Sequence, residues 1–262
     1  MRGLFPIGRL ILRIGISNRG MLHRAFARYD GGMSNQRITF EVCIDSVAGA
    51  LAAKDGGGDR LELCSALSEG GLTPSYGLVQ KVVSATDLPV MMMIRPRGDN
   101  FVYSPSEIDV MVAEIVAAKS LGVAGVVFGC LDAENEVDIN VNRKLLESCG
   151  TLSATFHRAF DEVADPMLAL SRIRDLGFDR ILTSGLAPSA EEGVATIRQL
   201  VEASGELVIM PGAGVRPENA GQIIAATGAV EIHGTASEPD LSQPGFKLTS
   251  VDIVRAIREQ LD

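Results

Sequence analysis

Short, β-prone apolar runs recur along this chain, and most of them end in a side chain that can do chemistry. Three of them close on Glu62-Leu-Cys64, Met93-Ile-Arg95 and Phe156-His157. Helix-like segments separate the runs, and this alternation predicts βα units around a parallel sheet. Because such a sheet binds its ligands at the carboxyl ends of its strands, the polar residues there predict a functional site.

Eight runs of this kind can be placed, and their starts lie about 20 to 35 residues apart, which leaves room for one helix and two loops in each interval. The chain has 262 residues, which matches the roughly 250 residues of one (β/α)8 barrel. The sequence therefore predicts an α/β fold that is a single (β/α)8 TIM barrel. The expected strands are residues 38–44, 60–64, 90–95, 125–129, 153–157, 180–184, 207–211 and 230–234.

Helix start and stop signals fall between the expected strands. Ser104, followed by proline, opens a long segment that ends at Gly122, and Asp165, also followed by proline, opens one that ends at Gly177. Proline in the first turn and glycine after the last turn are typical of α-helices. These signals support one helix between successive strands.

A weak internal repeat supports the strand count. A helix-ending glycine, a short link and a buried strand recur four times, and these units supply strands two, four, six and eight. Asp59-Arg60 and Asp179-Arg180 begin two of the strands. Since the amino ends of barrel strands lie on the face that serves stability, we interpret these pairs as structural.

The first 35 residues differ from the rest of the chain. No acidic residue precedes Asp30, and the apolar run among the arginines is too short to span a bilayer. An organelle transit peptide, a flexible basic arm and an upstream start ahead of a start near Met33 remain open. We expect residues 1–35 to be a dispensable basic extension and residues 36–262 to form the barrel. The arginines are Arg2, Arg9, Arg13, Arg19, Arg24 and Arg28.

Carboxylates and thiols occupy equivalent positions on the first two strands. Residues two apart point to the same face of a sheet, so Glu41 lies on the face of Cys43, and Glu62 on the face of Cys64. If those faces point inward, the barrel mouth holds all four side chains. An ionised carboxylate needs a partner in an apolar interior. By strand order, Arg95 is the expected partner of the two glutamates.

Further candidates lie at or just beyond the strand ends. Glu41, Glu62, His157 and Asp161 are candidate catalytic residues, because carboxylates and imidazoles transfer protons. The loop that contains Gly212 precedes a helix start after the seventh strand, where backbone N–H groups can bind a phosphate. The candidate substrate-binding residues are Arg95, Arg97, Arg158, Ser184, Gly212, Gly214 and His233.

Composition excludes several classes of function. The net charge of −9, without a basic stripe in the body of the chain, argues against a nucleic-acid partner. Four cysteines are too few and too scattered for a disulfide scaffold, which favours reduced thiols in the cytoplasm rather than a secreted or membrane protein. None of the five lysines ends an expected strand, which argues against a Schiff-base aldolase.

Several long motifs resemble those of the CutC copper homeostasis proteins. The resemblance runs without a break from about Phe40 to His233, and the chain departs from the family pattern at Leu186, at Ala213 and in the extension. It implies a (β/α)8 barrel, a cytoplasmic location and copper binding, with Cys43 and Cys64 at the cysteines on which that label depends. The clearest motifs are Phe40-Glu-Val-Cys-Ile-Asp-Ser46, Met93-Ile-Arg-Pro-Arg-Gly98, Thr155-Phe-His-Arg-Ala-Phe-Asp161 and Glu231-Ile-His-Gly234.

The resemblance favours a cytoplasmic protein that binds copper(I) through Cys43 and Cys64. Copper(I) prefers thiolate and thioether ligands, so two thiols on adjacent strands could give linear coordination, and Met93 could be a further soft ligand. Each of these cysteines alone would more often be a core residue. Their matched positions on adjacent strands are what points to a metal.

Two other functions remain open. The arginines, glutamates and histidines of the mouth are typical of an enzyme that acts on a small anionic or phosphorylated metabolite by acid–base chemistry. A divalent-metal sugar isomerase or epimerase that uses Glu41, Glu62, His157 and His233 ranks lower. The hydrophobic content of the chain, 46%, also leaves a homo-oligomer open.

Overall fold

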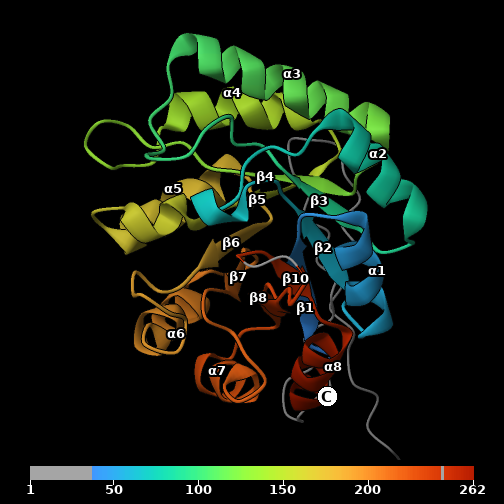
Figure 1. The fold of residues 1–262 in the computed structure, drawn as a ribbon. Helices are drawn as coiled ribbons and strands as arrows, with labels where there is room; N and C mark the ends of the chain where they lie inside the picture. The colour runs from blue at the N-terminus through green and yellow to red at the C-terminus, as the bar shows by residue number, and fades with distance from the viewer. Residues whose placement is uncertain (1–36, 243–244) are drawn as a thin grey trace, which may run out of the picture. The chain divides into compact units, whose positions relative to one another are not determined.

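The computed structural model describes residues 37–242 and 245–262, so the predicted basic extension lies outside the described residues. Eight parallel strands are hydrogen-bonded in the order β7-β6-β5-β4-β3-β2-β1-β8. Strand β7 lies beside β8, which makes the barrel nearly closed. Figure 1 shows the helices arranged around these strands, and the prediction of a single (β/α)8 barrel is confirmed. The strands are β1 (Thr39–Ile44), β2 (Arg60–Leu63), β3 (Val90–Met93), β4 (Gly125–Phe128), β5 (Ser153–Phe156), β6 (Arg180–Thr183), β7 (Val208–Pro211) and β8 (Glu231–Gly234).

Several strands end one or two residues earlier than the sequence predicts. Cys64, Arg95, His157 and Ser184 therefore lie just beyond the last residues of β2, β3, β5 and β6. Element ends are the part of a fold that sequence patterns fix least well. The shift moves these four side chains from the strands to the starts of the loops, and they stay at the carboxyl end of the barrel.

Each strand is followed by a helix, as predicted. Ser104 caps α3 with a capping box, in which Glu107 binds back to the Ser104 backbone, and Gly122 ends that helix with a φ of 76°. Asp165 accepts hydrogen bonds from the first turn of α5. Among the described residues, no helix is long and apolar enough to cross a membrane. The helices are α1 (Val47–Asp55), α2 (Tyr76–Ala85), α3 (Pro105–Leu121), α4 (Ile139–Cys149), α5 (Pro166–Leu176), α6 (Val194–Ala203), α7 (Ala220–Thr227) and α8 (Val251–Leu261), with 3₁₀ turns η1 (Leu67–Glu69) and η2 (Arg158–Glu162).

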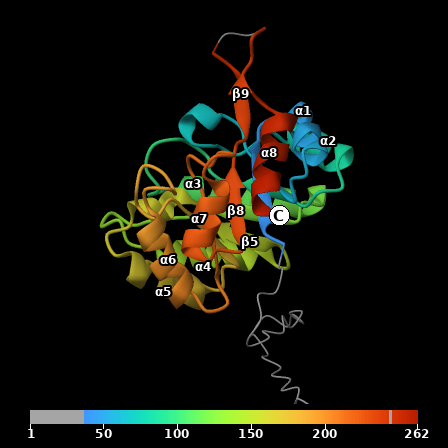
Figure 2. The ribbon, with the colours of Figure 1, turned by 90° about the horizontal axis from the view of Figure 1, so that it is seen from below.

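A short antiparallel hairpin follows the barrel strands and was not expected from the sequence. It pairs β9 (Ser237–Pro239) with β10 (Lys247–Thr249). Figure 2 shows β9 extending away from the barrel. A proline ends β9, and proline in a run argues against a strand when only the sequence is read.

The alternation of side chains along the strands divides the buried residues into two sets. Phe40, Val42 and Ile44 of β1 belong to the large core between the strands and the helices. Cys43 belongs instead to a small cluster inside the barrel, together with Cys64, Met91, Met93 and Val127. The predicted inward face is therefore the one that carries the thiols.

The interpretation of Asp59 and Asp179 as structural agrees with their contacts. Asp59 accepts a hydrogen bond of 2.8 Å from the Phe40 backbone N–H, and Asp179 accepts one of 2.8 Å from that of Ala154. Each aspartate thus fastens its own strand to the start of the preceding strand. The internal repeat seen in the sequence thus corresponds to a repeated hydrogen bond from a backbone N–H to an aspartate carboxylate.

Candidate metal and ligand site

The two thiols meet inside the barrel at its carboxyl end. Cys43 pairs in register with Glu62 on the neighbouring strand, and the Cys43 and Cys64 sulfurs lie 3.9 Å apart. The Cys64 thiol also donates to Glu62 Oε2 over 3.7 Å. Both cysteines are buried. A carboxylate and two thiols therefore lie within reach of one metal ion.

Met93 and Gly71 complete the sulfur-rich part of the site. A Cβ atom on Gly71 would lie 3.0 Å from the Cys64 sulfur and 3.5 Å from the Met93 methyl carbon. The loop after β2 thus packs directly on Cys64, and only a glycine leaves room for the sulfur there. Met93 brings a thioether side chain to the same neighbourhood.

Burial keeps both thiols protonated. The hydrogen bond to Cys64 and burial raise the pKa of Cys43 well above its ordinary value. The hydrogen bond from Cys43 lowers the pKa of Cys64, but burial and the Glu62 carboxylate outweigh it and raise that pKa to about 11. A metal ion that binds here must displace the thiol protons, because thiolates are the metal ligands.

A buried ion pair of Glu62 and His233 lies beside the thiols. Its Nε2–Oε2 distance is 2.9 Å. Burial alone would lower the pKa of His233, but the Glu62 carboxylate raises it well above the ordinary value. Burial alone would raise the pKa of Glu62, but the positive charge of His233 outweighs burial, and the pKa of Glu62 is lowered below its ordinary value. The favoured state of the pair is imidazolium and carboxylate.

The predicted ion pair between Arg95 and the glutamates is wrong. Glu41 binds the Arg60 guanidinium instead, and Arg60 also binds Glu231, which in turn accepts from Arg180 over 3.2 Å. These four buried or nearly buried side chains form a charged network deeper in the barrel. Arg60 and Arg180 were predicted to be structural, and both of them point into the barrel.

Arg95 fastens two loops at the mouth. Its guanidinium donates to the Glu69 carbonyl over 2.6 Å and the Gly71 carbonyl over 3.2 Å, and to the Asp99 carbonyl over 2.9 Å. It also lies over the Phe101 ring, 4.8 Å from the centroid. The loops after β2 and β3 are thereby held together above the sulfur pair.

His157 is a neutral imidazole with a fixed tautomer. Burial and the Arg95 charge lower its pKa to about 3. Its Nδ1 accepts a hydrogen bond of 3.3 Å from the Ala159 backbone N–H, so the proton lies on Nε2. Nε2 is buried and has no hydrogen-bond partner among the described residues. His157 thus contributes an unpaired donor to the barrel.

The other predicted catalytic residue, Asp161, anchors the loops around β6. It accepts hydrogen bonds from the Thr183 hydroxyl and from both the backbone and hydroxyl of Ser184. It also pairs with Arg158 at 2.7 Å. Arg97 is likewise engaged, by Glu107 at 2.6 Å and by loop carbonyls. Asp161, Arg158 and Arg97 are thus all bound to other residues of the protein in this conformation.

The glycine-rich loop after β7 packs against the site at His233. A Cβ atom on Gly212 would lie 2.5 Å from the Leu182 side chain and 3.3 Å from His233 Nδ1. Ala213 has a φ of 77° and Gly214 one of 71°, which favours glycine at both. The family pattern expected from the sequence has glycine at position 213, and this chain has alanine there. Ala213 therefore carries a side chain at a positive φ, where a Cβ atom is unfavourable.

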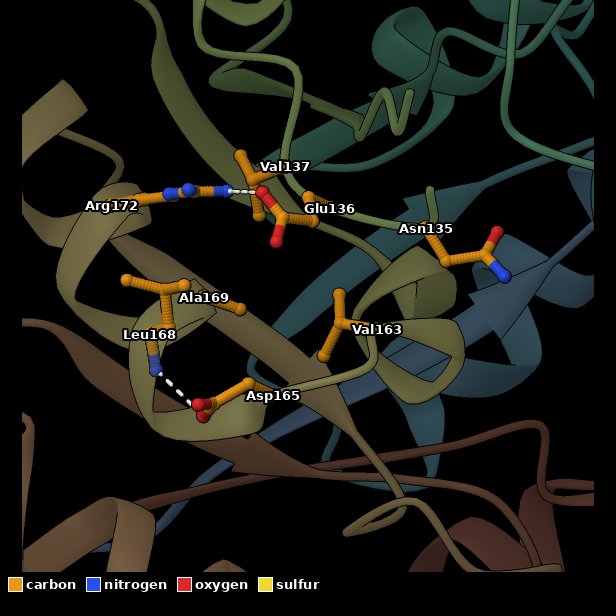
Figure 3. Close-up of a pocket in the computed structure, with 8 residues that line it drawn as sticks. All are labelled: Asn135, Glu136, Val137, Val163, Asp165, Leu168, Ala169 and Arg172. Atoms are coloured by element: carbon orange, nitrogen blue, oxygen red, sulfur yellow. Dashed lines mark hydrogen bonds and ion pairs between the residues drawn. The ribbon is translucent and has the colours of Figure 1, made fainter. Parts of the chain in front are cut away.

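A small surface pocket elsewhere contains none of the predicted site residues. It lies beside α5 and the loop before α4, and Figure 3 shows Glu136 and Asp165 among its lining residues. Arg172 binds Glu136 over 2.7 Å across it, and Asp165 accepts from the Leu168 backbone N–H. Because its polar groups bind each other, we do not place the function there.

Sequence reasoning missed the charged network and the place of Phe101. Arg60 lies two residues before Glu62, so the alternation that put Glu62 in the barrel also puts Arg60 there. That signal could have found it. Nothing in the pattern indicates that Phe101, in a loop, lies 4.8 Å from the His157 ring.

Comparison with solved structures agrees with the fold class, a TIM barrel. A thiamine phosphate pyrophosphorylase from Pyrococcus furiosus is 14% identical, with a TM-score of 0.57, and the match covers 87% of this chain and 96% of that one. At this identity the likeness concerns the fold alone.

Closer matches define the family. Residues 38–238 match the CutC family. A copper homeostasis protein cutC homolog from Homo sapiens is 48% identical over 87% of this chain and 85% of its own length. A family protein CutC from Bacteroides thetaiotaomicron is 44% identical over 83% and 88%. The crystal structure of a CutC copper homeostasis protein from Streptococcus agalactiae is 34% identical, with a TM-score of 0.72, over 76% of this chain and 98% of that one. The chain belongs to the CutC family.

Proposed function

We propose that this protein binds copper(I) through Cys43 and Cys64, as a copper homeostasis protein of the cytoplasm. The observation that carries the proposal is the sulfur pair, 3.9 Å apart and enclosed by the barrel. Soft thiolate ligands select copper(I). The relatives named for copper homeostasis support this cargo. None of the four cysteines, all within the described residues, forms a disulfide, which fits a reducing compartment.

The sulfur separation favours bent rather than linear coordination. Two thiolates that each lie about 2.3 Å from one ion are about 3.8 to 4.0 Å apart at tetrahedral to trigonal angles, and about 4.6 Å apart when linear. The observed 3.9 Å suits the bent arrangement. Glu62 Oε2 and the Met93 thioether are the candidates for a third ligand, and Met93 is the softer of the two.

Entry to the site would require the loops above it to open. Cys64 is 1% exposed, and Gly71 packs against its sulfur. Arg95 holds the Gly71 and Asp99 carbonyls together. We therefore propose that the loops fastened by Arg95 admit the ion and then cover it.

A competition assay tests the proposal. Copper(I) is titrated anaerobically against a chromophoric chelator, with the wild type, the Cys43→Ser/Cys64→Ser variant and a Cys130→Ser control. Cys130 is as buried as Cys64 and its thiol pKa is also raised by burial. We expect one copper(I) per chain in the wild type and the control, and none in the double variant with its circular dichroism unchanged. Stoichiometric uptake by the double variant would exclude the thiol site.

A second candidate function is an enzyme that acts on a small polar or anionic metabolite. It is favoured by buried polar atoms without partners among the described residues, which include His157 Nε2, Arg95 Nε and Glu62 Oε1. A ligand with both donors and acceptors would satisfy them. Arg97 and Arg158 would have to exchange their internal partners for a charged substrate.

Calorimetry separates this candidate from copper binding. Phosphate, sulfate and small phosphorylated acids are titrated into the wild type, Arg95→Ala and Cys43→Ser. The enzyme hypothesis predicts that Arg95→Ala weakens binding by about 1.5–3 kcal/mol, the value of a hydrogen bond to a charged group, and that Cys43→Ser does not. Equal binding to all three proteins would remove the hypothesis.

A further inference from the structure

A second set of potential ligands lies next to the sulfur pair. Glu41, Glu62 and His233 each offer an oxygen or nitrogen atom, and these atoms lie within 4.8 Å of one another. Glu41 on β1 pairs in register with His233 on β8, and Glu62 comes from β2 on the other side of β1. Three adjacent strands thus direct these side chains to one point in the barrel.

Two oxygen atoms of this set have no partner among the described residues. Glu41 uses Oε2 for Arg60 and Glu62 uses Oε2 for His233, while Oε1 of each glutamate is buried and unpaired. Glu41 is 0% exposed and Glu62 is 3% exposed. A buried carboxylate oxygen without a donor costs free energy, so the pair of them indicates a ligand that supplies positive charge.

The charges nearby are compatible with a cation. The carboxylates of Glu41, Glu62 and Glu231 contribute three negative charges, and the guanidiniums of Arg60 and Arg180 contribute two positive charges. With His233 as an imidazolium the six side chains are neutral overall. A metal ion that binds His233 displaces its proton, and the six side chains then carry a net charge of −1.

We propose that Glu41, Glu62 and His233 form a binding site for a divalent cation of the Zn²⁺ class, separate from the copper(I) site and next to it. Two carboxylates and an imidazole suit a borderline divalent ion and lack the sulfur that copper(I) prefers. Ligands that each lie about 2.1 Å from one tetrahedral ion are about 3.4 Å apart. Because Glu62 Oε2 and His233 Nε2 lie 2.9 Å apart, this pair separates slightly when the ion binds. Glu62 belongs to both sites and couples them.

The test uses Zn²⁺ calorimetry and the Co²⁺ absorption spectrum of the full chain. The variants are Glu41→Gln and His233→Gln, which each remove a proposed ligand, and Cys43→Ser/Cys64→Ser, which removes both thiols. Glu231→Gln is the matched control, because Glu231 shares the Arg60 partner of Glu41 but lies outside the site. If Glu41→Gln does not fold, His233→Gln carries the test, since it leaves the Arg60 contacts in place.

We expect Zn²⁺ affinity to fall at least about tenfold in Glu41→Gln and His233→Gln and to persist in the double cysteine variant and in Glu231→Gln. Bound Co²⁺ should show no sulfur charge-transfer band. Loss of Zn²⁺ binding in the double cysteine variant would place the ion on the thiols and overturn the proposal. Equal affinity in all variants, or no binding to the wild type, would also overturn it. Copper(I) uptake by the double cysteine variant reports on the thiol site, so failure of the copper(I) proposal is distinguished from failure of this one.

Discussion

Replacing Arg60 with methionine should destabilise the barrel strongly. The Arg60 guanidinium is the partner of Glu41, which is 0% exposed, and it shares Glu231 with Arg180. Removing one partner of a buried pair leaves an uncompensated charge, which costs about 3–5 kcal/mol. For a domain of this size the melting temperature should fall by about 6 to 20 °C.

Urea unfolding of Arg60→Met, measured beside Arg37→Met, provides the assay. Arg37 also binds a carboxylate, that of Asp59 at 2.9 Å, but its side chain is 60% exposed. Exposed pairs contribute about 0–1 kcal/mol, so the control should unfold close to the wild type. The contrast between the two arginines isolates burial as the cause.

A rescue variant sharpens the prediction. Glu41→Gln removes the charge that Arg60→Met leaves unpaired, so the double variant should be more stable than the sum of the two single changes predicts, by at least about 1 kcal/mol. Arg180 continues to neutralise Glu231 in that protein. A loss of stability in Arg60→Met no larger than in Arg37→Met, or strict additivity in the double variant, would refute the buried-charge argument.

Two further predictions concern His157 and Asp161. The pKa of His157 is lowered to about 3 in the folded protein from an ordinary 6.5, so the unfolded state binds more protons between those values and stability falls as the pH falls. When the pH is lowered from 7 to 5, the free energy of unfolding in urea should therefore fall by about 2 kcal/mol more in the wild type than in His157→Gln. Equal losses in the two proteins would contradict a neutral His157 imidazole. Asp161→Ala leaves the buried donors of Thr183 and Ser184 unpaired, so the free energy of unfolding should fall by at least about 1–3 kcal/mol. The loop after β6 should also be cleaved faster by a protease. A loss below 0.5 kcal/mol, roughly the size seen for surface substitutions, would show that these contacts are not needed.

The sequence predicted the strands and the inward face because both depend on local alternation. Glu41, Cys43, Glu62 and Cys64 all lie where period-two geometry placed them. The partner of the glutamates was predicted wrongly because strand order does not give height in the barrel. Glu62 is in register with Met91, and Arg95 follows four residues later, about 13 Å further along the strand direction.

Loop contacts could not be predicted from the pattern. Phe101 and Gly71 reach the site from segments without any periodicity, and their positions depend on carbonyls that Arg95 binds. The β9–β10 hairpin is held by its own pairing and not by a buried face that alternation would reveal. The positions of Phe101 and Gly71 therefore depend on tertiary contacts rather than on local preference.

The most direct test of the central claim is X-ray absorption at the copper edge of the copper(I)-loaded protein. The sulfur pair predicts two or three sulfur neighbours at about 2.3 Å, with the sulfur signal absent from the Cys43→Ser/Cys64→Ser variant. Bonding of copper only to nitrogen and oxygen, or an unchanged sulfur signal in the double variant, would contradict copper(I) binding by Cys43 and Cys64.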